Sequence, residues 1–127
     1  TVAGTETIMF VDDEPMLVNV FRQGLMRLGY KVDGFTDPRK AQEFFGKNAD
    51  KIDLVITDTT MPFMNGVDLA EWILEIKPGL PIILCTGFTT LISSEEAHRR
   101  GISDFVMKPY KIHDIAASVR ALLDKKD

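Results

Sequence analysis

Five short apolar runs, each followed by a stretch with helical periodicity, constrain this chain more than any other feature. The expected strands cover residues 7–11, 31–35, 54–57, 81–85 and 104–107. The expected helices cover residues 15–28, 38–45, 66–76, 91–100 and 112–123. The strands show little alternation of polar and apolar residues, which is typical of parallel strands covered on both faces. Right-handed crossovers between them predict an α/β fold with a doubly wound, five-stranded parallel sheet.

Local signals mark the ends of several of these helices. Asp37 precedes Pro38, a pairing that predicts an N-cap followed by proline in the first helical turn. Gly29 follows the first helix and is the expected C-cap. The apolar stripe of that first helix consists of Leu17, Phe21, Leu25 and Leu28.

Three aspartates stand where expected strands end. Asp12 and Asp13 follow the first strand, and Asp58 follows the third. Ligands of doubly wound sheets bind at this edge, outside the carboxyl ends of the strands. Crowded carboxylates repel each other, and a hard divalent cation such as Mg²⁺ relieves that repulsion. Thr86 and Lys108 reach the same edge, so the pattern predicts an acidic site for phosphoryl transfer. Taken singly, each of these residues could instead be a turn or cap residue, and Asp13 could cap the first helix.

With these residues in this order, the sequence resembles the receiver domains of two-component response regulators over about residues 6–123. The resemblance implies a flavodoxin-like (βα)₅ receiver fold. It also implies that Asp58 is the phosphoacceptor and that Mg²⁺ is the cofactor. The implied metal ligands are Asp12, Asp13, Asp58 and the main-chain carbonyl of Thr60.

The resemblance assigns roles to three further residues. It implies that Thr86 is the switch hydroxyl, Lys108 the phosphate-pairing lysine and Phe105 the aromatic switch residue, which here lacks a hydroxyl. It also implies a cis peptide bond between Lys108 and Pro109. Phe88 is a departure, because many receivers carry a small or polar residue there. We expect its ring either to slow water attack on the phosphoryl group or to face a partner.

The resemblance implies a phosphorelay switch rather than a turnover enzyme. A histidine kinase or histidine phosphotransfer domain would supply the phosphoryl group, and the domain would lose it by autodephosphorylation. The ILCTGF and TMPFMNG stretches are more similar to receivers of hybrid sensor histidine kinases than to receivers fused to DNA-binding domains. We therefore expect either a single-domain regulator or a receiver excised from a larger, membrane-associated kinase. Homodimerisation stays open.

Three other functions compete with this one. A haloacid-dehalogenase-like phosphatase also uses Mg²⁺ and an aspartate nucleophile, but its Asp-x-Asp pattern is absent after the first strand, which ends in Asp-Asp-Glu. A flavodoxin-like cofactor binder needs a phosphate-cradling loop where this chain has acids. A docking module that is never phosphorylated would not need the complete acidic set.

Composition excludes several classes of function. The chain has 127 residues and a formal net charge of −4, which predicts one domain spanning residues 1–127 and no direct contact with nucleic acid. No apolar run is long enough to span a membrane, and residues 1–7 do not resemble a signal peptide, so we expect a cytoplasmic domain without membrane contact. Cys85, the single cysteine, is the expected core thiol, pointing away from the face used by Thr86.

Overall fold

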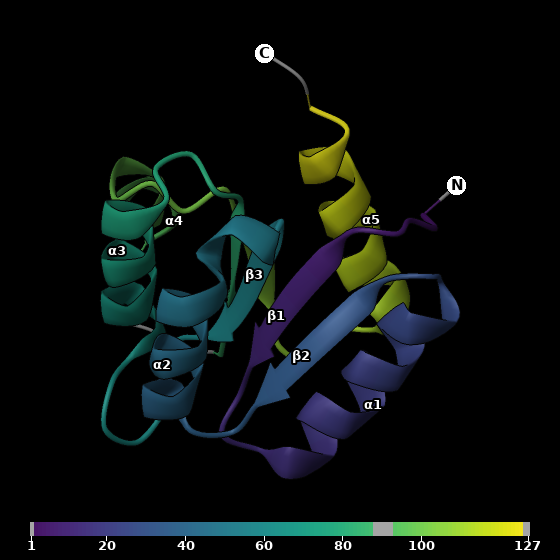
Figure 1. The fold of residues 1–127 in the computed structure, drawn as a ribbon, viewed down its shortest axis with the longest axis horizontal. Coiled ribbons are helices and arrows are strands. Elements are labelled where there is room, and N and C mark those ends of the chain that lie inside the picture. The colour runs from purple at the N-terminus through teal and green to yellow at the C-terminus, as the bar shows by residue number, and fades with distance from the viewer. Residues whose placement is uncertain (1, 88–92, 126–127) are drawn as a thin grey trace.

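The structure of the protein, a computed structural model, describes residues 2–87 and 93–125 (Figure 1). Its strands are β1 (Thr7–Val11), β2 (Lys31–Phe35), β3 (Leu54–Asp58), β4 (Ile82–Thr86) and β5 (Asp104–Met107). Its helices are α1 (Pro15–Arg27), α2 (Pro38–Asn48), α3 (Gly66–Ile76), α4 (Ser94–Arg99) and α5 (Ile112–Leu123), with a 3₁₀ turn, η1 (Ala49–Lys51), after α2.

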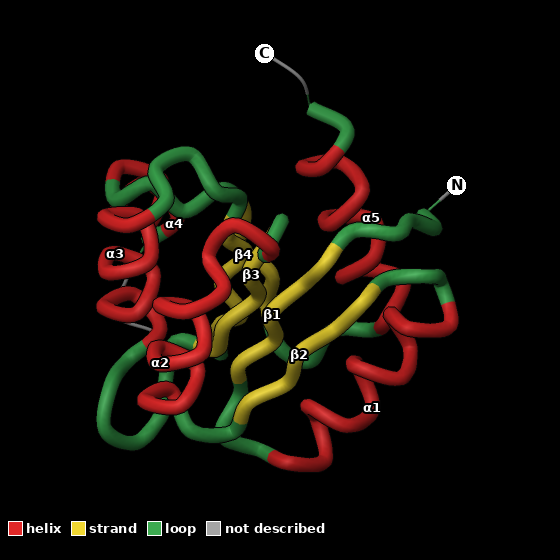
Figure 2. The backbone as a smooth tube through the Cα atoms, in the orientation of Figure 1, coloured by secondary structure: helices red, strands yellow, loops and turns green. Residues whose placement is uncertain are grey.

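The strands form one parallel sheet in the order β2-β1-β3-β4-β5. Helices α1 and α5 cover one face, and α2, α3 and α4 cover the other (Figures 1 and 2). The winding direction reverses between β1 and β3, because β2 lies on the far side of β1 and the later strands continue beyond β3. The predicted doubly wound sheet is therefore confirmed, and the reversal places its ligand-binding edge beside β1 and β3.

Alternate residues of each strand feed two separate cores. In β1, Met9 and Val11 pack beneath α2 and α3, whereas Ile8 and Phe10 pack beneath α1 and α5. All four are buried, as expected for a strand covered on both faces. The sheet is thus packed on both faces, and this packing fixes the position of the residues at its carboxyl edge.

Local chemistry explains where α2 begins and ends. The side chain of Asp37 accepts a hydrogen bond from the amide of Arg39, so the predicted cap is confirmed. The helix runs to Asn48, beyond the expected end at residue 45. Phe45 is fully buried, and the side-chain amide of Asn48 donates to the carbonyl of Phe44, which satisfies a group at the end of the helix. Burial of Phe45 therefore outweighs the helix-weakening effect of Gly46.

The buried stripe of α1 differs in detail from the expected one. Phe21 and Leu25 are buried, but Leu17 and Leu28 are only half-buried, and Val18 is buried instead. A Cβ added at Gly34 of β2 would lie 2.6 Å from Cγ1 of Val18. The bare backbone of this glycine therefore lets α1 rotate toward β2.

Candidate functional site

Three carboxylates converge at the reversal point of the sheet. Asp12 directly follows β1, Asp13 comes next, and Asp58 ends the neighbouring strand β3. One carboxylate oxygen from each residue lies within 4.8 Å of the others. Asp12 and Asp58 are 1% and 6% exposed, whereas Asp13 lies open to solvent. The structure therefore brings the predicted acidic residues together in a pocket that opens on the Asp13 side.

Asp12 also fixes the start of α1. Its Oδ1 accepts a hydrogen bond of 2.9 Å from the amide of Glu14, the residue that precedes the helix. This contact belongs to Asp12 and not to Asp13, so the alternative role of Asp13 as a helix cap is not seen. The Asp13 carboxylate is instead positioned among the acids of the pocket.

Lys108 reaches across the pocket from the end of β5. Its Nζ lies 3.1 Å from Oδ2 of Asp12 and 3.2 Å from Oδ1 of Asp58. Burial lowers the pKa of the lysine, but the charges and hydrogen bonds of the two aspartates outweigh this effect and raise it overall. The ammonium group is therefore a firmly protonated cation shared by two buried carboxylates. The peptide bond from Lys108 to Pro109 is cis, as the family resemblance implies.

The carboxyl group of Asp58 is electrostatically unusual. Burial raises its pKa above the ordinary value, and the negative charge of Asp12 adds to the rise, while Lys108 opposes it. The ionised form of Asp58 is thus destabilised, and the binding of a cation or an electrophile to its carboxylate is favoured. Perturbed carboxylates of this kind are typical of functional sites.

The loop after Asp58 is anchored at both ends. The amide and the hydroxyl of Thr59 both donate to the carbonyl of Cys85, at 3.0 and 3.1 Å, and the amide of Gly66 donates to the carbonyl of Thr59. A Cβ at Gly66 would lie 1.9 Å from the carbonyl oxygen of Asp58, so only glycine allows this closure. Thr60 follows the buried Thr59 and is exposed beside the pocket.

Thr86 ends β4 and is fully buried. Its hydroxyl donates to the sulfur of Met107, 3.1 Å away, on the paired position of β5. The sequence did not reveal this partner, because the register between β4 and β5 is needed to find it. A thioether is a weak acceptor, so the hydroxyl is held only loosely.

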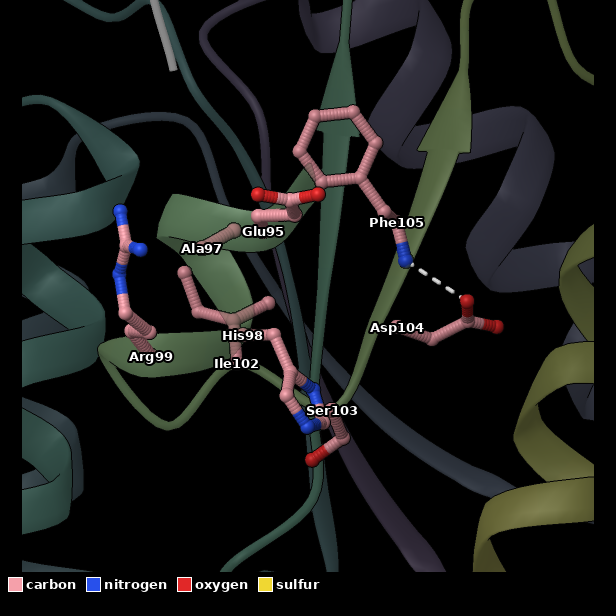
Figure 3. Close-up of a pocket in the computed structure, with 8 residues that line it drawn as sticks. All are labelled: Glu95, Ala97, His98, Arg99, Ile102, Ser103, Asp104 and Phe105. Atoms are coloured by element: carbon pink, nitrogen blue, oxygen red, sulfur yellow. Dashed lines mark hydrogen bonds between the residues drawn. The ribbon is translucent and has the colours of Figure 1, made fainter. Parts of the chain in front are cut away.

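Phe105 lies two residues before Met107 and on the same side of β5. It is partly buried against the core beneath α3 and α4. It lines a groove of about 590 Å³ between α4 and β5, together with Glu95, Ala97, His98, Arg99, Ile102, Ser103 and Asp104 (Figure 3). Phe105 therefore connects β5, the strand that leads into Lys108, with a groove on the outer surface of the protein.

Cys85 and Phe88 complete the predicted features. Cys85 is buried among residues beneath α1 and α5, on the opposite side of the sheet from Thr86, as expected. Burial raises the pKa of its thiol to about 12, which makes it unreactive. Phe88 lies outside the described residues.

Residues 8–120 match the family described as the response regulator receiver domain. The chain belongs to this family. Chemotaxis protein CheY of Thermotoga maritima is 33% identical over 105 residues, which cover 82% of this chain and 86% of that protein. A crystal structure of a response regulator receiver domain protein from Clostridium thermocellum shares 26% identity and a TM-score of 0.89, covering 94% of both chains. The receiver assignment from the sequence is confirmed. Membership of this family excludes the two competing functions, a haloacid-dehalogenase-like phosphatase and a flavodoxin-like cofactor binder.

Some relatives are much longer than this chain. The DNA-binding transcriptional regulator NtrC of Azospirillum brasilense is 34% identical over 119 residues, which cover 93% of this chain but only 24% of that protein. The resemblance to receivers of hybrid kinases is not tested by these relatives and stays a prediction. No helix within residues 2–87 and 93–125 is both long and apolar enough to cross a membrane.

Proposed function

We propose that this receiver domain accepts a phosphoryl group on Asp58 from a phosphohistidine donor. The observation that carries the proposal is the position of the Lys108 ammonium group, within 3.2 Å of both buried carboxylates. A cation held at that point can pair with phosphoryl oxygens once they arrive at Asp58. Burial and the charge of Asp12 raise the pKa of Asp58, so its ionised oxygen is more basic and a better nucleophile toward phosphorus.

The acidic pocket suits a hard divalent cation. Its donors are carboxylate oxygens, the ligands that Mg²⁺ prefers, and their mutual repulsion favours a cation. Asp12, Asp13 and Asp58 would hold the ion, with the main-chain carbonyl of Thr60 as a further ligand. When bound, Mg²⁺ neutralises charge on the carboxylates and on the phosphoryl oxygens.

The chain's own residues then divide the work of transfer. An ionised oxygen of Asp58 attacks the phosphorus atom, the P–N bond to the donor imidazole breaks, and the imidazole leaves with the bonding electrons. Lys108 turns from the carboxylates to the new phosphoryl oxygens. Thr86 exchanges its weak bond to Met107 for one to a phosphoryl oxygen, a stronger acceptor. The vacated space beside β5 would let Phe105 rotate inward.

The partners and setting follow from this role. We infer a histidine kinase or a histidine phosphotransfer domain as the donor, and a switch that dephosphorylates itself rather than a turnover enzyme. Residues 1–127 would form one domain, with its core at about 6–123, in a cytoplasmic setting. Nucleic-acid contact, where a longer protein makes it, would belong to another domain, because the formal net charge here is −4.

Intact-mass measurement tests the proposal directly. Acetyl phosphate and Mg²⁺ should add one phosphoryl group to the wild-type chain and none to Asp58→Asn. Asp50→Asn, which removes an exposed carboxylate from η1, is the matched control and should be labelled like the wild type. Equal labelling of wild type and Asp58→Asn would refute the assignment of the phosphoacceptor.

A further inference from the structure

Phe63, in the loop after Asp58, has an unusual backbone conformation. Its φ is 74°, and the amide of Met64 donates to the carbonyl of Pro62 at 2.9 Å, which closes a three-residue γ-turn around it. A bulky residue is strained at positive φ, where glycine and asparagine are the usual occupants. Phe63 is 72% exposed, so burial does not explain why the strain is tolerated.

The contact that holds Phe63 comes from the start of α2. The guanidinium carbon of Arg39 lies 3.6 Å from the centre of the Phe63 ring, a cation–π contact. Arg39 is itself held by Asp37, which accepts from Nε at 3.1 Å and from Nη2 at 2.9 Å. These hydrogen bonds lower the pKa of Asp37, so the carboxylate stays ionised and keeps the guanidinium group in place.

This contact joins the start of α2 to the loop between β3 and α3. Helix α2 follows β2, and the Phe63 loop follows β3, so both segments come after the carboxyl ends of strands, at the edge of the sheet that carries the acidic pocket (Figure 1). Thr59 and Gly66 fix the base of the Phe63 loop through their mutual hydrogen bond. Between them, Thr60 is only three residues before Phe63.

We propose that Arg39 and Phe63 form a clamp that positions the Thr60 main chain as a Mg²⁺ ligand and thereby raises the affinity of the pocket for Mg²⁺. This role rests on the proposed function, because it concerns the same metal site. Without the clamp, the strain at Phe63 is relieved by a change to negative φ. That change opens the turn between Pro62 and Met64 and moves the adjoining backbone of Thr60 away from the pocket. Arg39 and Phe63 are thus positioning residues that never touch the ion.

The clamp and a simple charge effect predict opposite changes in Mg²⁺ affinity when Arg39 is replaced. Removing a positive charge near an acidic pocket, by itself, strengthens the binding of a cation. Loss of the clamp has the opposite effect, because a ligand is misplaced. Lys40 is the matched control, since it is the exposed cation next to Arg39 and makes no ion pair within residues 2–87 and 93–125. Arg39→Gln and Lys40→Gln remove the same charge, but only the first breaks the clamp.

Mg²⁺ titration of the unphosphorylated protein, followed by amide NMR shifts, measures the effect without any transfer reaction. We expect Arg39→Gln to weaken Mg²⁺ binding by about threefold, equal to about 0.7 kcal/mol, and Lys40→Gln to leave it unchanged or tighter. The Met64 amide should exchange faster with solvent in Arg39→Gln. Phe63→Gly should bind Mg²⁺ like the wild type, because glycine adopts positive φ without strain. Adding Arg39→Gln to Phe63→Gly should then not weaken binding further.

The possible outcomes separate the clamp from the function on which it rests. Equal or tighter Mg²⁺ binding by Arg39→Gln overturns the clamp, and so does a weakening that persists fully in the Phe63→Gly background. If Asp13→Asn loses Mg²⁺ affinity while Arg39→Gln does not, the proposed function stands and the clamp alone is rejected. If the wild-type protein shows no saturable Mg²⁺ binding, the proposed metal site and the clamp are both refuted.

Discussion

Replacing Asp13 with Asn should stabilise the metal-free protein, whereas most substitutions destabilise a fold. One carboxylate oxygen from each of Asp12, Asp13 and Asp58 lies within 4.8 Å of the other two. A pair of like charges at that distance repels by about 0.9 kcal/mol at the dielectric constant of water and by about 3.5 kcal/mol at an effective value of 20. Asp13 is exposed, and Lys108 offsets part of the repulsion, so we expect a net gain of about 1 kcal/mol.

Thermal unfolding with EDTA at pH 7.5 and low salt measures this gain. An increase of about 1 kcal/mol corresponds to a rise in Tm of roughly 4 °C for a domain of this size. The gain should shrink at high salt, because the exposed charge is screened. Asp50→Asn makes the same change in net charge away from the pocket and should leave Tm nearly unchanged.

Mg²⁺ should reverse the order of stability. The wild-type protein gains stability as the ion binds the native state, whereas Asp13→Asn has lost one anionic ligand and gains less. A fall in the metal-free Tm of Asp13→Asn would refute the crowded-acid explanation, because it would show that Asp13 makes a net favourable contact. A rise of equal size in Asp50→Asn would assign the gain to net charge and not to the pocket.

Three further predictions concern other parts of the chain. Lys108→Met should lower the free energy of unfolding of the metal-free protein by about 2–3 kcal/mol in urea, because it leaves two buried carboxylates unpaired; an unchanged value would contradict this. Hydrogen bonds from Arg120 lower the pKa of Glu6 from 4.5 to about 2. Its contribution of about 1 kcal/mol is therefore present above pH 4.5 and is lost toward pH 2, so melting curves of Glu6→Gln and wild type should differ at pH 7 and converge near pH 2. Phe88→Ala should shorten the phosphoryl half-life by about threefold, or about 0.7 kcal/mol of barrier, as measured by phosphate release; an unchanged half-life would assign Phe88 to partner binding.

The sequence predicts the sheet and the acidic pocket well because both depend on short-range patterns. An apolar run that ends abruptly in Asp12 or Asp58 marks both a buried strand and the carboxyl end of that strand. The bounds of α3 (Gly66–Ile76) were also predicted from the sequence, and the Asn65 side chain that accepts from Asp68 caps this helix. In such places the local residues decide the structure, and distant packing changes little.

Features that depend on distant pairs could not be predicted from the sequence. Arg39 and Phe63 are far apart along the chain, and nothing in either local sequence indicates their contact. The bond from Thr86 to Met107 needs the register of β4 on β5. The end of α2 depends on how deeply Phe45 is buried, which tertiary packing decides. The residues of the pocket were therefore predictable, but these two contacts were not.

The contacts of β5 suggest how a phosphoryl group on Asp58 would affect a distant surface of this fold. Strand β5 carries Phe105 and Met107 and leads directly into Lys108, so one short segment bears the groove residue, the Thr86 acceptor and the pocket's cation. The sulfur of Met107 competes poorly with a phosphoryl oxygen for the Thr86 hydroxyl. A phosphoryl group on Asp58 would therefore draw Thr86 and Lys108 inward together. Because a close-packed core leaves few voids, the space that Thr86 vacates beside β5 would then favour inward rotation of the Phe105 ring, and this rotation would change the groove between α4 and β5.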